Sequence, residues 1–279
     1  MKTTFITPKD SAVRFMEIVK ETETCGTKRP DKFRKTMRQN RGSIQLFSPY
    51  GPTEDGLERK NPVIVALGDS VTAGHFEFAG DPGELFSKVD SGQLGENDII
   101  EITDARECYL EKFRAGLIDY YEQTSVSTIN SGIAGDTMYG MEKRLERDVI
   151  RYQPDLIIIN GSLNWGQECG DTAAYRKVLT SVLDRILEKT DADVILLTPN
   201  MELPGPFANP LSSLEERVAV IRSLASEKDV CLADAYAAWK AYETAGYPVS
   251  DLLANGMNHP SVTGHEAYAE VLMKLIRDE

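Results

Sequence analysis

Short runs of valine, isoleucine and leucine recur along this chain without alternating with polar residues. The runs are VIVAL (63–67), VSTIN (126–130), LIIIN (156–160), VILLT (194–198) and VCLA (230–233). A strand with one buried face shows apolar–polar alternation, whereas a continuous apolar run suits a strand that is covered on both faces. The pattern therefore predicts five buried strands of a parallel sheet.

Amphipathic helical patterns separate these runs. The clearest is an apolar stripe at helical spacing from Tyr175 to Leu187, and similar stripes cover 141–152, 214–224 and 268–276. The last helix is predicted to begin at TGHE, where Thr263 and Glu266 would form a capping box. Alternating strands and helices predict an α/β fold in which helices sandwich a five-stranded parallel sheet.

The length of the chain, 279 residues, fits one large α/β domain with an arm. We expect residues 62–279 to form the domain and residues 1–61 to form an arm packed on it. The arm contains a predicted helix at about 10–21, a basic stretch interpreted as a solvated or salt-bridged face (28–41) and a possible strand, SIQLF (43–47). A long acidic insertion, 76–104, follows the first strand, and long loops at such positions often shape a binding site.

Charge and composition argue against several classes of protein. Lysine and arginine number 31 and aspartate and glutamate 44, so the formal charge is −13, which disfavours nucleic acid and anionic membranes as partners. No apolar run approaches the roughly 20 residues that span a bilayer, and the N-terminal sequence is a poor signal peptide. The four cysteines are far apart without a C-x-x-C pair, which predicts reduced structural thiols in a cytoplasmic protein.

Polar and glycine residues follow the predicted strands at the points where active sites form in parallel sheets, outside the carboxyl ends. Ser70 follows the first strand, Gly135 the second and Asn164 the third, and His259 comes just before the last helix. All four can therefore meet at one edge of the sheet. Asp234, which follows the fifth strand, is predicted to cap a helix instead.

This convergence predicts acyl transfer by a serine nucleophile. Ser70 would need a base, for which His259 is placed, and an oxyanion would need hydrogen-bond donors. The backbone N–H groups of Ser70 and Gly135 and the side-chain amide of Asn164 could supply them. No G-x-S-x-G elbow, G-x-G-x-x-G loop, P-loop or H-E-x-x-H helix is present, so the usual α/β-hydrolase, nucleotide and zinc-protease arrangements lack support.

Four segments resemble the conserved blocks of SGNH (GDSL-type) hydrolases, in the same order. They are GDSVTAGH (68–75), INSGIAGDT (129–137), GSLNW (161–165) and NHPSVTGH (258–265). The resemblance spans about 62–279 and implies a flavodoxin-like three-layer α/β/α sandwich, an esterase, lipase, thioesterase or carbohydrate deacetylase activity, and no metal or cofactor. It also implies Ser70 as nucleophile, His259 as base, and Gly135 and Asn164 in the oxyanion hole.

The last block departs from the family pattern at the acid of the triad. The family usually carries D-x-x-H, but Gly256 stands three residues before His259 and Asn255 four before it. We expect the carboxamide of Asn255 to orient the imidazole. Asp251, a backbone carbonyl or an engineered change are the alternatives for the missing acid.

The predicted function is a serine esterase for short acyl groups, above all acetyl on a carbohydrate, with a small-molecule or oligosaccharide ester as partner. A lysophospholipase or thioesterase is the alternative among enzymes, and a catalytically impaired ligand-binding member is the alternative from another class. Four further side chains are interpreted structurally: Asp69 holds the turn before Ser70, His265 lies in the helix cap, Trp165 is a buried indole, and His75 lines the pocket mouth or is structural.

Overall fold

A single parallel sheet organises the chain, as the apolar runs predict. The computed structural model describes residues 8–40, 61–93, 95, 98–122, 125–204 and 208–278. The sheet has five strands in the order β4-β1-β5-β6-β7, and every neighbouring pair is parallel. Its strands are β1 (Val63–Gly68), β4 (Ser127–Gly132), β5 (Leu156–Asn160), β6 (Asp193–Leu197) and β7 (Cys231–Ala233).

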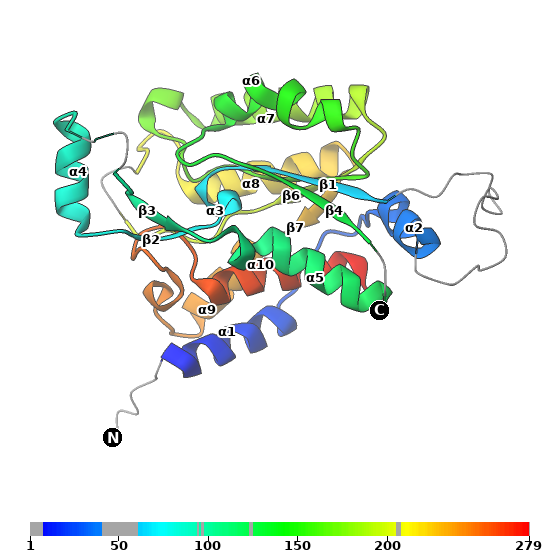
Figure 1. Cartoon of the computed structure of the whole chain (residues 1–279), viewed down its shortest axis with the longest axis horizontal. Coiled ribbons are helices and arrows are strands. Elements are labelled where there is room, and N and C mark those ends of the chain that lie inside the picture. Colours follow the sequence, from blue (N-terminus) through cyan, green and yellow to red (C-terminus); the bar gives the residue numbers. More distant parts are fainter. Residues whose placement is uncertain are drawn as a thin grey trace.

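Helices cover both faces of this sheet and give a three-layer sandwich (Figure 1). One face carries α6 (Met138–Asp148), α7 (Thr172–Lys189) and α8 (Leu214–Glu227); the other carries α1 (Pro8–Glu21), α5 (Tyr109–Tyr121), α9 (Ala235–Thr244) and α10 (Val262–Ile276). Successive residues of β1 point to opposite layers, Ile64 and Ala66 to one and Val65 and Leu67 to the other. Both sets are fully buried, which explains the continuous apolar runs.

Shorter elements complete the described chain. They are α2 (Asp31–Asn40), α3 (Ser70–Ala73), β2 (His75–Phe78), α4 (Pro82–Asp90), β3 (Glu101–Thr103), η1 (Ala105–Glu107), η2 (Ile150–Tyr152), η3 (Gln167–Cys169) and η4 (Val249–Leu252). No helix among the described residues combines the length and the apolar character needed to cross a membrane. The four cysteines, all of which lie in the described part, are free thiols.

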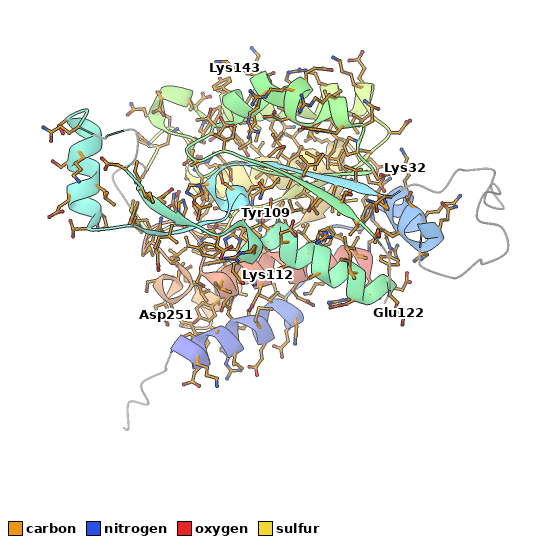
Figure 2. The ribbon with its side chains drawn as sticks, viewed as in Figure 1. Lys32, Tyr109, Lys112, Glu122, Lys143 and Asp251 are labelled. Carbon is orange, nitrogen blue, oxygen red and sulfur yellow. The ribbon has the colours of Figure 1, made fainter. Side chains whose placement is uncertain are left out.

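The N-terminal helices pack against the last two helices of the domain. Phe15 of α1 contacts the rings of Trp239 and Tyr242 edge-on at centroid distances of 5.1 and 5.2 Å. Ser11 donates to Asp251 at 2.9 Å, and Asp251 lies beside α1 in Figure 2. In the basic stretch, Arg34 and Arg38 pair with Asp278, so the described part of it is a salt-bridged face. The predicted strand at 43–47 lies outside the described residues.

The start of α10 differs from the prediction. Ser261, not Thr263, is the N-cap, and its hydroxyl accepts from the Gly264 N–H, so the helix begins at Val262 and the expected capping box is wrong. His265 therefore lies inside the first turns, fully buried, and its Nδ1 accepts the N–H of Tyr109. Asp234 caps α9 as predicted and also accepts two hydrogen bonds from Arg222.

The insertion after β1 forms a ribbon at one end of the sheet. Strands β2 and β3 pair antiparallel, with His75 opposite Thr103 and Phe78 opposite Glu101, and the register shifts between these pairs. Helix α4 lies between them in sequence and stands at the left end of the molecule in Figure 1. The ribbon follows α3 directly, so it lies next in sequence to the segment that carries Ser70.

We predict that Gly132→Ala lowers the free energy of unfolding by about 1–3 kcal/mol. A Cβ at Gly132 would lie 2.2 Å from the backbone nitrogen of Ala73. A flexible side chain could move out of the way of such a contact, but the main chain of α3 cannot do so without a shift of the helix. Chemical denaturation measures the effect. Gly80→Ala is the matched control, because its Cβ would meet nothing closer than 4.0 Å. Equal stability of the two variants would contradict the close approach of α3 to β4.

Candidate active site

The register of three strands sets the position of the site. Gly68 at the end of β1 pairs with Gly132 of β4 on one side and with Asn160 of β5 on the other. The chain segments that leave these strands therefore start from one edge of the sheet. Ser70, Gly135 and Asn164 each follow one of these strand ends within a few residues, so the segments that carry them start from adjacent strands.

A buried arginine fixes this edge. The guanidinium of Arg144 donates to the carbonyl oxygens of Gly68 at 2.8 Å and Ser131 at 2.7 Å. It also pairs with the carboxylate of Asp136 at 2.7 Å and that of Asp148 at 3.0 Å. One side chain thus connects the end of β1, the end of β4 and the residue after Gly135. No feature of the sequence blocks pointed to Arg144, which lies in the middle of α6.

A tight turn presents Ser70 at the first position of α3. Asp69 is the N-cap, and its Oδ1 accepts the Val71 N–H at 3.0 Å, so Asp69 holds the turn as predicted. Gly68 is required, because a Cβ there would meet Thr72 Oγ1 at 1.9 Å. As the first helical residue, Ser70 has an N–H without an acceptor inside the helix. The structure thus leaves this N–H available beside the Ser70 hydroxyl.

The side chains of Ser70 and His259 are brought together. His259 Nε2 lies 2.9 Å from Ser70 Oγ, and both residues are buried. This distance falls within the range of a nucleophile paired with its general base. The other ring nitrogen, Nδ1, lies 3.1 Å from the carbonyl oxygen of Phe76. Because a carbonyl can only accept, it selects the tautomer with hydrogen on Nδ1 and leaves Nε2 free to accept from Ser70.

Glu101 also lies beside His259, and the sequence motifs did not identify it. Its Oε1 is 3.3 Å from His259 Nδ1, and its Oε2 is 2.7 Å from Nδ1 of His75. The one available signal was its place in the acidic insertion that was expected to shape the site. His75, for which pocket and structural roles were both open, contacts this carboxylate and lies edge-on to the His259 ring.

The structure corrects the placement of Asn255. Its Oδ1 accepts the backbone N–H groups of Met257, Asn258 and His259 at 2.9–3.0 Å, so it closes the turn before His259 and does not contact the imidazole. The turn uses the oxygen that the imidazole would have needed. Two other groups were considered as partners of the His259 ring. Asp251 accepts a hydrogen bond from Ser11 of α1 instead. A backbone carbonyl, that of Phe76, does lie beside His259 Nδ1.

Burial controls the ionisation of the site. It lowers the pKa of His259, while the nearby Glu101 carboxylate and the Phe76 carbonyl act in the opposite direction. His259 is therefore neutral at neutral pH and can accept a proton. Burial also lowers the pKa of His265 to about 3 and raises the pKa of Asp69 to about 7. The Oδ2 atom of Asp69 is buried, and the described residues offer it no hydrogen-bond partner.

Gly135 and Asn164 lie together on the wall of a cavity of about 540 Å³. The N–H of Asp136 donates to Ile133 O in a turn that gives Gly135 a φ of +70°, a conformation that glycine adopts without strain. Asn164 Nδ2 donates to Asp136 O at 3.2 Å, which leaves its second hydrogen for another acceptor. Gly135 and Asn164 therefore share one wall of the cavity, and Asn164 has a hydrogen that can be donated into it.

The rest of this cavity wall combines polar and apolar side chains in about equal number. It is formed by Thr137, Leu163, Gly166, Gln167, Glu168, Glu202, Leu203, Pro204, Ala208, Met257 and Asn258. Burial raises the pKa of Glu202, and the nearby cation of Arg217 opposes this. Trp165 is buried behind the wall against Tyr139 and Tyr175, as predicted.

Comparison with known proteins shows which family the chain resembles. The profile of the GDSL-like lipase/acylhydrolase family matches residues 66–267. An acetylxylan esterase of Geobacillus stearothermophilus is 26% identical over 166 residues, covering 56% of this chain and 74% of that protein.

Solved structures share the fold. A lipase/acylhydrolase from Enterococcus faecalis superposes with a TM-score of 0.56 at 23% identity, covering 76% of this chain and 94% of that one. A GDSL-like lipase described as putative, from Parabacteroides merdae, gives a TM-score of 0.58 at 19% identity, with 78% and 96% covered. With its profile match over most of the domain, the chain belongs to the GDSL-like lipase/acylhydrolase family, a family of ester-hydrolysing enzymes.

Proposed function

We propose that this protein is a serine esterase that removes short acyl groups, such as acetyl, from a carbohydrate. The observation that carries the proposal is the 2.9 Å contact between His259 Nε2 and Ser70 Oγ at the carboxyl edge of the sheet. A nucleophile in contact with a neutral base is the arrangement that acyl transfer requires. It also argues against a member that only binds its ligand.

In the proposed reaction, His259 accepts the hydroxyl proton as Ser70 Oγ attacks the ester carbonyl. The negative charge that develops on the carbonyl oxygen is stabilised by the N–H groups of Ser70 and Gly135 and by the Asn164 amide. Protonated His259 then donates its proton to the leaving alcohol. His259 next takes a proton from a water molecule, whose oxygen attacks the carbonyl of the acyl-enzyme. The acid then leaves as His259 returns that proton to Ser70 Oγ.

The cavity next to these donors supports a polar alcohol part. Two carboxylates, Glu168 and Glu202, and the amides of Gln167 and Asn258 line it together with five apolar side chains. Sugar hydroxyls can donate to such carboxylates, whereas an anionic lipid headgroup would be repelled. The similarity to an acetylxylan esterase points to the same substrate class. A lysophospholipase or thioesterase finds less support in this lining.

A substrate series tests the acyl and alcohol preference. We expect kcat/KM for p-nitrophenyl esters to fall steadily as the acyl chain grows from acetyl to octanoyl. Acetylated xylooligosaccharides should be deacetylated with release of acetate, measured enzymatically. Highest activity on long-chain or lysophospholipid substrates would favour the alternative instead.

Ser70→Ala should abolish nearly all ester hydrolysis while the fold is retained, because no other group occupies the nucleophile position. Residual activity above the uncatalysed rate would come from the donors that bind the oxyanion. Ser87→Ala, an exposed serine-to-alanine change on α4, is the matched control and should keep full activity. A folded Ser70→Ala enzyme with the turnover of Ser87→Ala would refute the nucleophile assignment.

Asn164→Ala should lower kcat by about 10²–10³ with a much smaller change in KM, since its amide acts on charge that appears in the transition state. Asn164→Asp should lose at least as much, because a carboxylate cannot donate and repels the oxyanion. Steady-state kinetics on p-nitrophenyl acetate measures both. Parent-like kcat in both variants would exclude Asn164 from the oxyanion hole.

The pH profile should follow the protonation of His259. Because burial lowers the pKa of its imidazole, the neutral base forms at lower pH than for an exposed histidine. We therefore expect kcat/KM to rise with pH and to level off, with a midpoint below about 6.5. The measurement is the initial rate at low substrate between pH 4.5 and 9. A midpoint above the ordinary histidine value would contradict the assigned base.

A further inference from the structure

One carboxylate is shared by two histidines beside the proposed nucleophile. Glu101 Oε2 lies 2.7 Å from His75 Nδ1, and Glu101 Oε1 lies 3.3 Å from His259 Nδ1. Its side chain is 17% exposed and that of His259 is 4% exposed, so solvent screens their interaction only in part. The final loop, where the family usually places its acid, contributes no carboxylate to His259 among the described residues.

We propose that Glu101 is the positioning residue that stabilises protonated His259 during acyl transfer, so that the β2–β3 ribbon supplies the acid of the triad. The proposal rests on the proposed function, because it concerns the proton that His259 takes from Ser70. It extends the proposed function by naming the residue that supplies the negative charge of the triad. That residue lies in the insertion after β1 and not in the loop just before His259, where the family usually carries its acid.

Two groups of the ribbon act on the same nitrogen in different ways. The Phe76 carbonyl on β2 accepts the Nδ1–H at 3.1 Å and fixes the tautomer and the ring orientation. Glu101 on β3 adds the full negative charge that a carbonyl lacks. When His259 becomes an imidazolium, this charge stabilises it in a buried setting, which is the part an aspartate plays in a Ser-His-Asp triad.

His75 holds Glu101 in the required orientation. His75 Nδ1 is hydrogen-bonded to Glu101 Oε2, so the other oxygen of Glu101, Oε1, is the one that faces His259. The centroids of the two imidazole rings are 6.2 Å apart. The groups that bear on the charge of His259 are therefore Ser70 on α3, His75 on β2, Glu101 on β3 and the neutral, buried His265 on α10. Glu101 and the Phe76 carbonyl both favour the cation, and of these two Glu101 is the one that carries a negative charge.

The test compares three variants of the full chain: Glu101→Gln, Glu101→Asp and Glu77→Gln. Glu77 is an exposed residue of β2, so its variant removes an equal charge from the same ribbon without touching His259. We expect Glu101→Gln to lower kcat by about 10- to 100-fold with little change in KM, since Phe76 still fixes the tautomer. Glu101→Asp should retain more activity than Glu101→Gln, and Glu77→Gln should match the parent.

The pH dependence separates a charge effect from a structural one. Glu101 favours protonated His259, so its removal should move the acidic limb of kcat/KM to lower pH. A merely structural role would lower activity without that displacement. Parent-like kcat and an unmoved limb in folded Glu101→Gln would overturn the proposal.

An NMR titration provides a readout that does not depend on activity. The chain has three histidines, and a His259→Gln spectrum identifies the ring signal of His259. Its pKa should fall in Glu101→Gln and stay unchanged in Glu77→Gln; equal values in parent and Glu101→Gln would overturn the proposal. If Glu101→Gln does not fold, Glu101→Ala decides, because it also removes the charge: a lowered pKa of His259 supports the proposal and an unchanged one overturns it. A parent without esterase activity would refute the proposed function, and the titration would still decide whether Glu101 acts on His259.

Discussion

The site is built on the ends of three neighbouring strands that lie in register. Gly68, Gly132 and Asn160 lie side by side, and the Arg144 guanidinium binds the carbonyls of Gly68 and Ser131. A shift of one strand by a single residue would turn its side chains to the other layer and carry its loop away from the others. Register therefore fixes both the core and the relative positions of Ser70, Gly135 and Asn164.

Burial gives this edge its chemical character. It lowers the pKa of His259, so the imidazole is a base at neutral pH, but burial also makes the imidazolium costly once it has taken a proton. A nearby negative charge offsets that cost. The sheet and its last loop do not provide one, because Asn255 is neutral and closes a turn. The ribbon of β2 and β3 carries Phe76 and Glu101 to the open side of the imidazole.

Local patterns predicted the framework well, and their failures have physical causes. The five apolar runs became the five strands, since continuous burial on both faces leaves a clear signature in composition. The start of α10 was predicted wrongly because serine and threonine are both favoured as N-cap residues. Ser261 and Thr263 lie two positions apart, and residue preference alone does not choose between them. Asn255 was misassigned because closeness in sequence to His259 was taken as closeness to its ring, whereas its oxygen faces the main chain.

Local sequence patterns were enough to predict the α/β class, the strands and the residues that follow them, because each depends on neighbours within a few positions. The spacing of Ser70, Gly135 and Asn164 after the strands and of His259 before the last helix also predicted that these residues meet, and the structure brings Ser70 and His259 into contact. The groups that complete this edge of the sheet became visible once the chain was folded. Arg144 and Glu101 lie 74 and 31 residues after Ser70, counted from their numbers, and reach it through helix packing and strand pairing. Long-range contacts of this kind leave no periodicity or spacing in the chain, because the intervening loops can have almost any length.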